Sequence, residues 1–117
     1  MLIIGEIGKT LGIEAKSMKV SAWSNGKDQY GIRVGKPNRR EYFDPRWEAI
    51  TVTVDGVAHR FALTKGFWND CPEFRDKGQP VIGQWLASQD LLNWPRGKPP
   101  KLFLSHIKDN FFELRLA

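Results

Sequence analysis

The sequence predicts an α+β fold that consists mainly of antiparallel strands with one substantial helix. Apolar and polar residues alternate in several short segments, as they do in strands with one buried face. Two of these segments are joined by Asp55-Gly56, a preferred sequence for a two-residue hairpin turn. A helical period of apolar residues follows Pro80. We therefore expect a strand-dominated sheet with one main helix and one or two short helices.

The hairpin at Asp55-Gly56 determines its own register. Both positions of a type I′ turn need positive φ, which Asp and Gly tolerate better than most residues. Closing the turn there predicts four strand pairs: Val54–Val57, Val52–His59, Ile50–Phe61 and Glu48–Leu63. One face of the hairpin then carries Ile50, Val52, Val54, Val57, Phe61 and Leu63, and the other carries Thr51, Thr53, Ala58 and Arg60.

The segments before the hairpin predict two strands and a short helix. Residues 1–16 contain three glycines and no sustained period, so they are expected to form an arm or an extra strand. Alternation predicts strands over Met18–Ser24 and Tyr30–Gly35, and the residues Asn-Gly-Lys-Asp between them are typical of a turn. Pro37 suits the first turn of a helix, which we expect over Asn38–Phe43.

The segments after the hairpin predict a turn, a helix and two closing strands. Phe67–Pro72 is expected to be a compact aromatic turn, with a helical turn that reaches Arg75. Pro80 begins the main helix, which we expect to continue to about Asn93 and to bury Ile82, Trp85 and Leu86. The closing strands are predicted over Leu102–Ile107 and Phe111–Leu116, with Phe112, Leu114 and Leu116 pointing inward.

Length and composition predict one domain over residues 1–117. Hydrophobic residues make up 41% of the chain and charged residues 26%, as in globular proteins. The single cysteine, Cys71, excludes an internal disulfide, and we expect neither a signal peptide nor a membrane span. We therefore expect a cytoplasmic protein.

Positive charge is concentrated in two stretches of the sequence. The net charge is +5, and residues 25–46 contain six basic residues against three acidic ones. Residues 95–108 contain four basic residues and no acidic one. Two basic stretches are typical of a protein that binds a polyanion, most simply nucleic acid, although such charge also serves solubility alone.

Signatures of catalysis and of metal binding are weak. Gly5–Thr10 resembles the end of a phosphate-binding loop but lacks its first glycine and the strand before it. His59, His106 and Cys71 do not have the spacing of a metal site. Asp70 and its acidic neighbours are better explained as a solvated face. We therefore expect no enzymatic activity, metal, cofactor or small-molecule substrate.

Short motifs resemble the B-three DNA-binding domain of plant transcription factors, whose pseudobarrel also serves some restriction endonucleases. The sequence IRVGKP at 32–37, followed by EYF at 41–43, is similar to the strand, basic turn and helix of that family. Residues 47–63 resemble its central hairpin, and LTKGFW at 63–68 resembles its Leu-Thr-Lys-Gly-Trp stretch. Residues 96–100 stand where the family has Gly-Asp before its penultimate strand.

The resemblance implies a barrel-like core over residues 18–116, with about six to seven strands in a predominantly antiparallel sheet. It also implies two arms that enter the major groove of DNA, residues 24–33 and residues 64–69. The implied nucleic-acid-binding residues are Asn25, Lys27, Gln29, Arg33, Lys36, Arg39, Arg40, Thr64, Lys65 and Asn69.

The function that these patterns favour is non-catalytic binding of double-stranded DNA, with sequence preference left open. Arg and Lys contact phosphates, while Arg, Asn and Gln also contact base edges. One alternative is a protein-interaction or inhibitor protein of a mobile element that meets an acidic protein partner. Another is a single-stranded nucleic-acid binder that stacks bases on Trp23, Tyr30 and Trp68.

Overall fold

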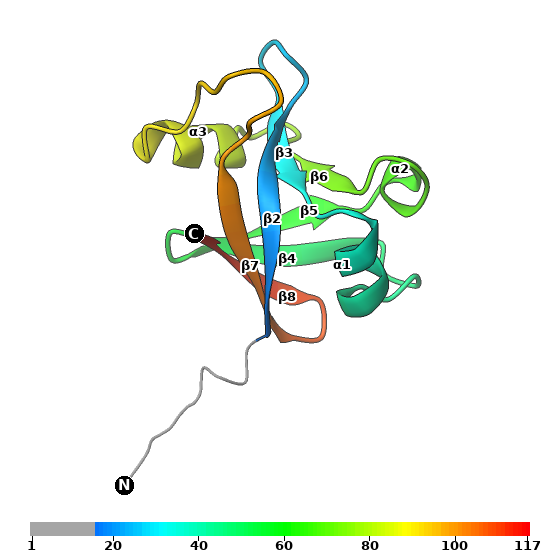
Figure 1. Cartoon of the computed structure of the whole chain (residues 1–117). Helices are drawn as coiled ribbons and strands as arrows, with labels where there is room; N and C mark the ends of the chain where they lie inside the picture. The colour runs from blue at the N-terminus through cyan, green and yellow to red at the C-terminus, as the bar shows by residue number, and fades with distance from the viewer. Residues whose placement is uncertain (1–15) are drawn as a thin grey trace, which may run out of the picture.

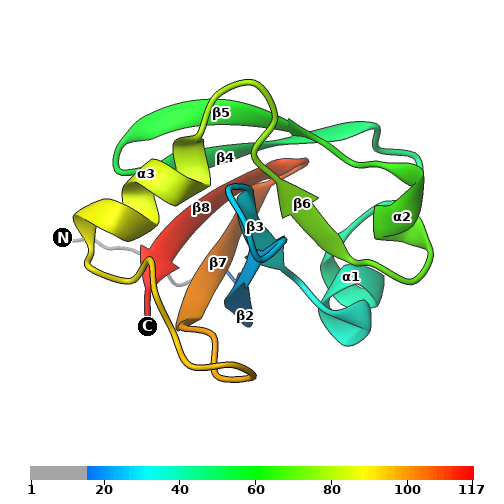
Figure 2. The same ribbon diagram turned by 90° about the horizontal axis from the view of Figure 1, so that it is seen from above.

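The computed structural model describes residues 16–117, which form a strongly curved sheet with helices on its outside (Figure 1). Seven strands follow one another in the order β5-β4-β8-β7-β2-β3-β6. The strands are β2 (Lys16–Ser24), β3 (Tyr30–Arg33), β4 (Ala49–Val54), β5 (Val57–Ala62), β6 (Glu73–Arg75), β7 (Lys101–Lys108) and β8 (Phe111–Leu116). The helices are α1 (Lys36–Tyr42), α2 (Lys65–Trp68) and α3 (Val81–Ser88). Seen from above, the sheet curls into a nearly closed barrel with β5 and β6 at its two edges (Figure 2).

The β4–β5 hairpin has the register that the sequence predicts. Val54 pairs with Val57, Val52 with His59 and Ile50 with Phe61. Asp55 and Gly56 have φ of 52° and 83°, as a type I′ turn requires. The amide of Leu63 donates to the carbonyl of Glu48 at 2.9 Å, which extends the pairing beyond the strands. The inward face is buried except at His59, which is half-buried, and at Val57 beside the turn, which is 57% exposed.

The sheet is predominantly antiparallel, as the sequence predicted, but it contains one parallel pair of strands. β4 runs parallel to β8, with Val52 opposite Phe112, while every other neighbouring pair of these seven strands is antiparallel. The parallel pair joins the β4–β5 hairpin to the β7–β8 hairpin, although the two lie far apart in the sequence. The alternation of apolar and polar residues shows which face of a strand is buried but not which strand it pairs with. It therefore could not predict the β4–β8 pair.

Two helices differ in extent from the expectation. α1 begins at Lys36, two residues early, because Gly35 adopts φ 87° and Pro37 occupies the first turn. α3 ends at Ser88 and not near Asn93, so the predicted main helix was too long. Asp90 has φ 58°, a left-handed conformation that ends the helix.

The segment after α2 is the clearest wrong prediction. Glu73–Arg75 is strand β6, where the sequence predicted a helical turn through Arg75. β6 pairs with β3, and Phe74 lies opposite Ile32 with both side chains buried. A three-residue strand gives too little alternation to be recognised, and only its partner β3 defines it.

The core fills the inside of the curved sheet. Met18, Val20 and Ala22 point inward from β2, and Ile82, Trp85 and Leu86 cover the core from α3, the last three as predicted. Phe112 and Leu114 are also buried, but Leu116, predicted to point inward, is 48% exposed at the end of its strand. No described helix is long and apolar enough to cross a membrane. The expectation of an N-terminal arm or extra strand falls on residues 1–16, of which all but Lys16 lie outside the described residues.

Candidate nucleic-acid interface

A groove of about 700 Å³ lies between the β2–β3 hairpin and the loop that leads from α3 to β7. Its walls bring together Lys27 and Arg33 from the first basic stretch and Arg96 from the second. Trp23, Tyr30 and Trp94 supply aromatic rings. The remaining lining residues are Ala22, Ser24, Asn25, Gly26, Leu92, Asn93, Gly97 and Pro99. None of these described residues is acidic, so the side chains that line the groove are cationic or neutral.

The tip of the β2–β3 hairpin is held by the side chain of Asn25. Its Oδ1 accepts hydrogen bonds from the amides of Lys27 at 2.8 Å and of Asp28 and Gln29 at 3.1 Å each. Gly26 takes φ 86° in this turn. Because Oδ1 is used inside the loop, the Asn25 side chain fixes the loop that carries Lys27, and only its amide nitrogen is free to donate elsewhere.

One row of residues runs across β2, β3 and β6 on the outer face of the sheet. Trp23 pairs with Gly31, and Gly31 pairs with Arg75. The Arg75 guanidinium lies over the Trp23 ring, 4.2 Å from its centroid. Gly31 is required because a Cβ at this position would collide with the carbonyl oxygen of Phe74. The cation–π contact orients the ring that lines the groove.

A second row places two guanidinium groups beside one carboxylate. Glu73 Oε1 is 3.7 Å from Arg33 and 3.6 Å from Arg75. The Glu73 side chain is 3% exposed, whereas those of Arg33 and Arg75 are 56% and 41% exposed. The buried Glu73 carboxylate therefore restrains the guanidinium groups of Arg33 and Arg75, while much of each side chain remains exposed to solvent.

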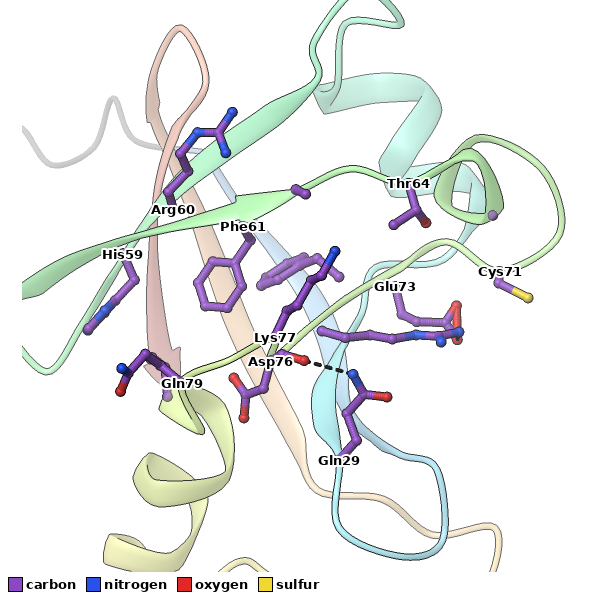
Figure 3. A pocket seen from close by; sticks show the side chains of 15 residues that line it. Gln29, His59, Arg60, Phe61, Thr64, Cys71, Glu73, Asp76, Lys77 and Gln79 are labelled. Atoms are coloured by element: carbon purple, nitrogen blue, oxygen red, sulfur yellow. Dashed lines mark hydrogen bonds and ion pairs between the residues drawn. The ribbon is translucent and has the colours of Figure 1, made fainter.

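Three more predicted site residues form hydrogen bonds within the described chain. Gln29 Nε2 donates to the carbonyl of Asp76 at 2.7 Å, the dashed contact in Figure 3. Arg39 donates from one nitrogen to the carbonyls of Phe67 at 2.6 Å and Asn69 at 3.0 Å. Thr64 caps α2 by accepting from the Phe67 amide at 3.3 Å. These side chains hold the hairpin and the α2 loop in place.

The remaining predicted residues lie around α1 and α2, outside the lining of the groove. Lys36 is 3.6 Å from Asp70, and both side chains are more than half exposed. Arg40, Lys65 and Asn69 are exposed. The structure thus divides the ten predicted residues. Asn25, Lys27 and Arg33 line the groove, and Arg39 ties α1 to the α2 loop that begins with Thr64.

Arg46 shows why counting basic residues overstates the available charge. Its guanidinium binds Asp44 at 2.7 Å, and the same side chain lowers the pKa of Asp44 to about 2 through that hydrogen bond. Arg46 is therefore neutralised locally. In contrast, Arg96 lines the groove together with Arg33, although it lies more than sixty positions after Arg33 in the sequence.

Trp94 and Arg96 line the groove, and Arg75 lies over the groove residue Trp23, but all three were missing from the predicted site. Arg96 stood in the second basic stretch, which was noted as charge without a position in the fold. Trp94 is half-buried and meets the Tyr30 ring edge-on at 6.2 Å. Arg75 was hidden by the wrong helical assignment of its segment. Strand alternation would have placed Glu73 and Arg75 on one face.

Within residues 16–117, no three His, Cys, Asp or Glu side chains gather as a metal site would require. No protein-family model, curated protein or solved structure matches this chain.

Proposed function

We propose that this protein binds double-stranded DNA without catalysis, through the groove beside the β2–β3 hairpin. The observation that carries the proposal is the meeting of the two basic stretches, with Lys27, Arg33 and Arg96 lining one groove that has no acidic lining residue. Cations that converge on one surface neutralise several phosphates at once and release their counterions. The exposed hairpin tip, fixed by Asn25, supplies the projecting element.

The residues divide into two expected tasks. Lys27 and Arg96 lie on loops and are expected to contact phosphates, which position a duplex without reading it. Arg33 is restrained by Glu73 and is the candidate for base-edge contacts, because a fixed guanidinium presents two parallel donors to guanine. This division makes any sequence preference depend on β3.

Single-stranded nucleic acid remains the second candidate because of one specific observation. Three aromatic rings, those of Trp23, Tyr30 and Trp94, line the same groove as the cations. Bases stack on such rings whatever their identity. Trp68, proposed earlier as a third platform, packs edge-on against Phe67 at 5.0 Å and does not line the groove.

A binding assay on labelled duplex and single-stranded oligonucleotides tests both candidates. The triple variant Lys27→Ala, Arg33→Ala, Arg96→Ala should bind duplex about a hundredfold more weakly at low salt, because three phosphate contacts are lost. The matched control replaces three exposed cations outside the groove, Lys16, Lys108 and Arg115, with Ala. Equal losses in both triple variants would reject the groove, and tighter binding of single strands by the wild type would favour the second candidate.

The exposed free thiol of Cys71 supports the proposed cytoplasmic location. A lone unpaired cysteine is usual where the compartment keeps thiols reduced.

A further inference from the structure

A second cavity, a cleft of about 800 Å³, lies between the free edges of β5 and β6. Each of these strands has one strand neighbour in the described sheet, β4 for β5 and β3 for β6. The barrel therefore has an open seam, and side chains from both edges and from the start of α3 line it (Figure 3). The cleft is separate from the groove, with no lining residue in common.

The walls of the cleft present backbone hydrogen-bonding groups. The Leu63 amide donates to the Glu48 carbonyl, next to the start of β4. Because backbone groups in an antiparallel pair face alternately toward and away from the partner strand, those of Arg60 and Ala62 face the free edge. The Asp76 amide bonds the Tyr30 carbonyl on β3, so the backbone groups of Arg75 face the opposite free edge. Arg60, Ala62 and Arg75 all line the cleft. Paired N–H and C=O groups at a strand edge match the donors and acceptors on the edge of a nucleobase.

The floor of the cleft is aromatic. The Phe61 and Phe74 rings lie 5.0 Å apart at 55°, one from each strand. Figure 3 shows the Phe61 ring projecting from β5 into the space between the strands. Both residues are buried, at 4% and 1% exposed, so a planar apolar ring would meet only the parts of them that face the cleft, and about 800 Å³ is ample for a nucleotide.

Two buried carboxylates line the cleft, and one has unused hydrogen-bonding capacity. Asp76 accepts from the amides of Ile82 at 2.7 Å and Gly83 at 2.9 Å. Glu73 Oε2 is buried and has no hydrogen-bond partner among the described residues. A buried carboxylate oxygen without a partner is costly, so a donor supplied by a ligand would stabilise it.

Exposed charge around the cleft is positive. Arg60, Arg75 and Lys77 are exposed, whereas the acidic residues Glu73 and Asp76 are 5% and 7% exposed. The cleft thus combines an aromatic floor, hydrogen-bonding walls, a buried acceptor and a cationic rim. A ligand that fits all four is planar and apolar in its ring, carries donor groups at one edge and ends in an anion.

We propose that this cleft binds a nucleotide, with the base against Phe61 and Phe74 and the phosphate among Arg60, Arg75 and Lys77. The nucleotide has two sources, a free 5′-monophosphate or an unpaired nucleotide that projects from DNA held in the neighbouring groove. The first source is independent of the proposed DNA binding, and the second rests on it.

The first experiment titrates the protein with the four ribonucleoside 5′-monophosphates, up to about 5 mM, and follows the backbone amides by NMR. Nucleotide binding should shift the amides of Arg60, Ala62 and Arg75, and affinity should exceed that for ribose 5-phosphate by at least about tenfold. Equal affinity for ribose 5-phosphate would overturn the proposal, because the rim alone would then explain the binding.

The second experiment fills the cleft. Ala62→Trp places a large ring in the cleft at an exposed position, and Ala58→Trp is its control on the same face of the same strand but outside the cleft. Ala62→Trp should weaken nucleotide binding by about tenfold or more, with Ala58→Trp unchanged. Equal behaviour of the two variants would overturn the assignment.

A third measurement separates the two sources. A duplex with one bulged nucleotide is compared with the fully paired duplex, in the wild type and in Ala62→Trp. If the wild type binds the bulged duplex about tenfold more tightly than the paired one, and Ala62→Trp loses this preference, the cleft is assigned to DNA. If the free nucleotide binds saturably and the protein does not prefer the bulged duplex, the cleft is assigned to the free ligand. If neither the mononucleotides nor the bulge binds preferentially, the proposal is wrong, while equal binding of both duplexes leaves the groove intact as a DNA site.

Discussion

Two regions of this molecule carry arginines from the same basic stretch, and the fold uses them differently. At the β2–β3 hairpin, Arg33 is 56% exposed, lines the groove and has one carboxylate partner within residues 16–117, at 3.7 Å. At the corner between α1 and α2, Arg39 donates two hydrogen bonds to backbone carbonyls. The guanidinium of Arg39 therefore stabilises the fold, whereas that of Arg33 is available to contact a ligand. The comparison shows that basic sequence alone does not identify a binding surface.

The largest stability effect that we expect separates these two uses of arginine. Arg39→Ala removes hydrogen bonds to the Phe67 and Asn69 carbonyls, and it should lower the free energy of unfolding by about 2 kcal/mol. Arg40→Ala, the exposed neighbour, should change it by less than about 0.5 kcal/mol. Urea denaturation measures both, and equal values would remove the distinction between the α1–α2 corner and the groove.

The hairpin tip should show an intermediate effect. Asn25→Ala removes the acceptor for three amides and should cost about 1 kcal/mol, whereas Asn25→Asp keeps the oxygen and should cost less. Gln29→Ala should likewise act on stability by about 1 kcal/mol, since its amide is bound to the Asp76 carbonyl. Thermal unfolding checks these values, and an Asn25→Asp variant as unstable as Asn25→Ala would contradict the assigned role.

The pH dependence of stability tests Asp76, whose carboxylate accepts hydrogen bonds from the first turn of α3. Burial raises the pKa of Asp76, while hydrogen bonds from the amides of Ile82 and Gly83 and the charge of His59 oppose the shift. The folded protein therefore holds this proton more tightly than the unfolded chain does. The free energy of unfolding should fall as the pH rises from the ordinary Asp pKa through the folded value.

The variant Asp76→Asn removes that titration and isolates its contribution. Wild type should lose stability relative to the variant as the pH rises through this interval, as measured by urea denaturation at a series of acidic pH values. Parallel stability curves for the two proteins would show that Asp76 does not titrate differently in the folded state.

The smallest expected effect on duplex binding concerns Trp23 in the groove. Trp23→Phe keeps an aromatic ring beneath Arg75, whereas Trp23→Ala removes it and should weaken single-strand binding by about tenfold. Duplex binding should change less than about threefold, because phosphate contacts dominate it. A larger loss for duplex than for single strands in Trp23→Ala would reverse the order of the two proposed functions.

The sequence specified local structure well and contacts between distant segments poorly. The hairpin at Asp55-Gly56 was predictable to the residue pair because its turn chemistry and alternation agree. The parallel β4–β8 pair and the three-residue strand β6 were not, because their stabilising partners lie elsewhere in the chain. For the same reason Lys27 and Arg33 were identified from the sequence, whereas the place of Arg96 in the groove and of Arg75 over Trp23 became known only with the fold.

The salt dependence of duplex binding tests the central claim most directly, because it counts the phosphates that the groove neutralises. We predict that log Kobs falls steeply with log salt for the wild type, and that the Lys27, Arg33, Arg96 triple alanine variant reduces the slope by about 2 to 3. The control variant at Lys16, Lys108 and Arg115 should keep the wild-type slope. Identical slopes for the wild type and the groove variant would contradict the claim that these three cations together hold the duplex.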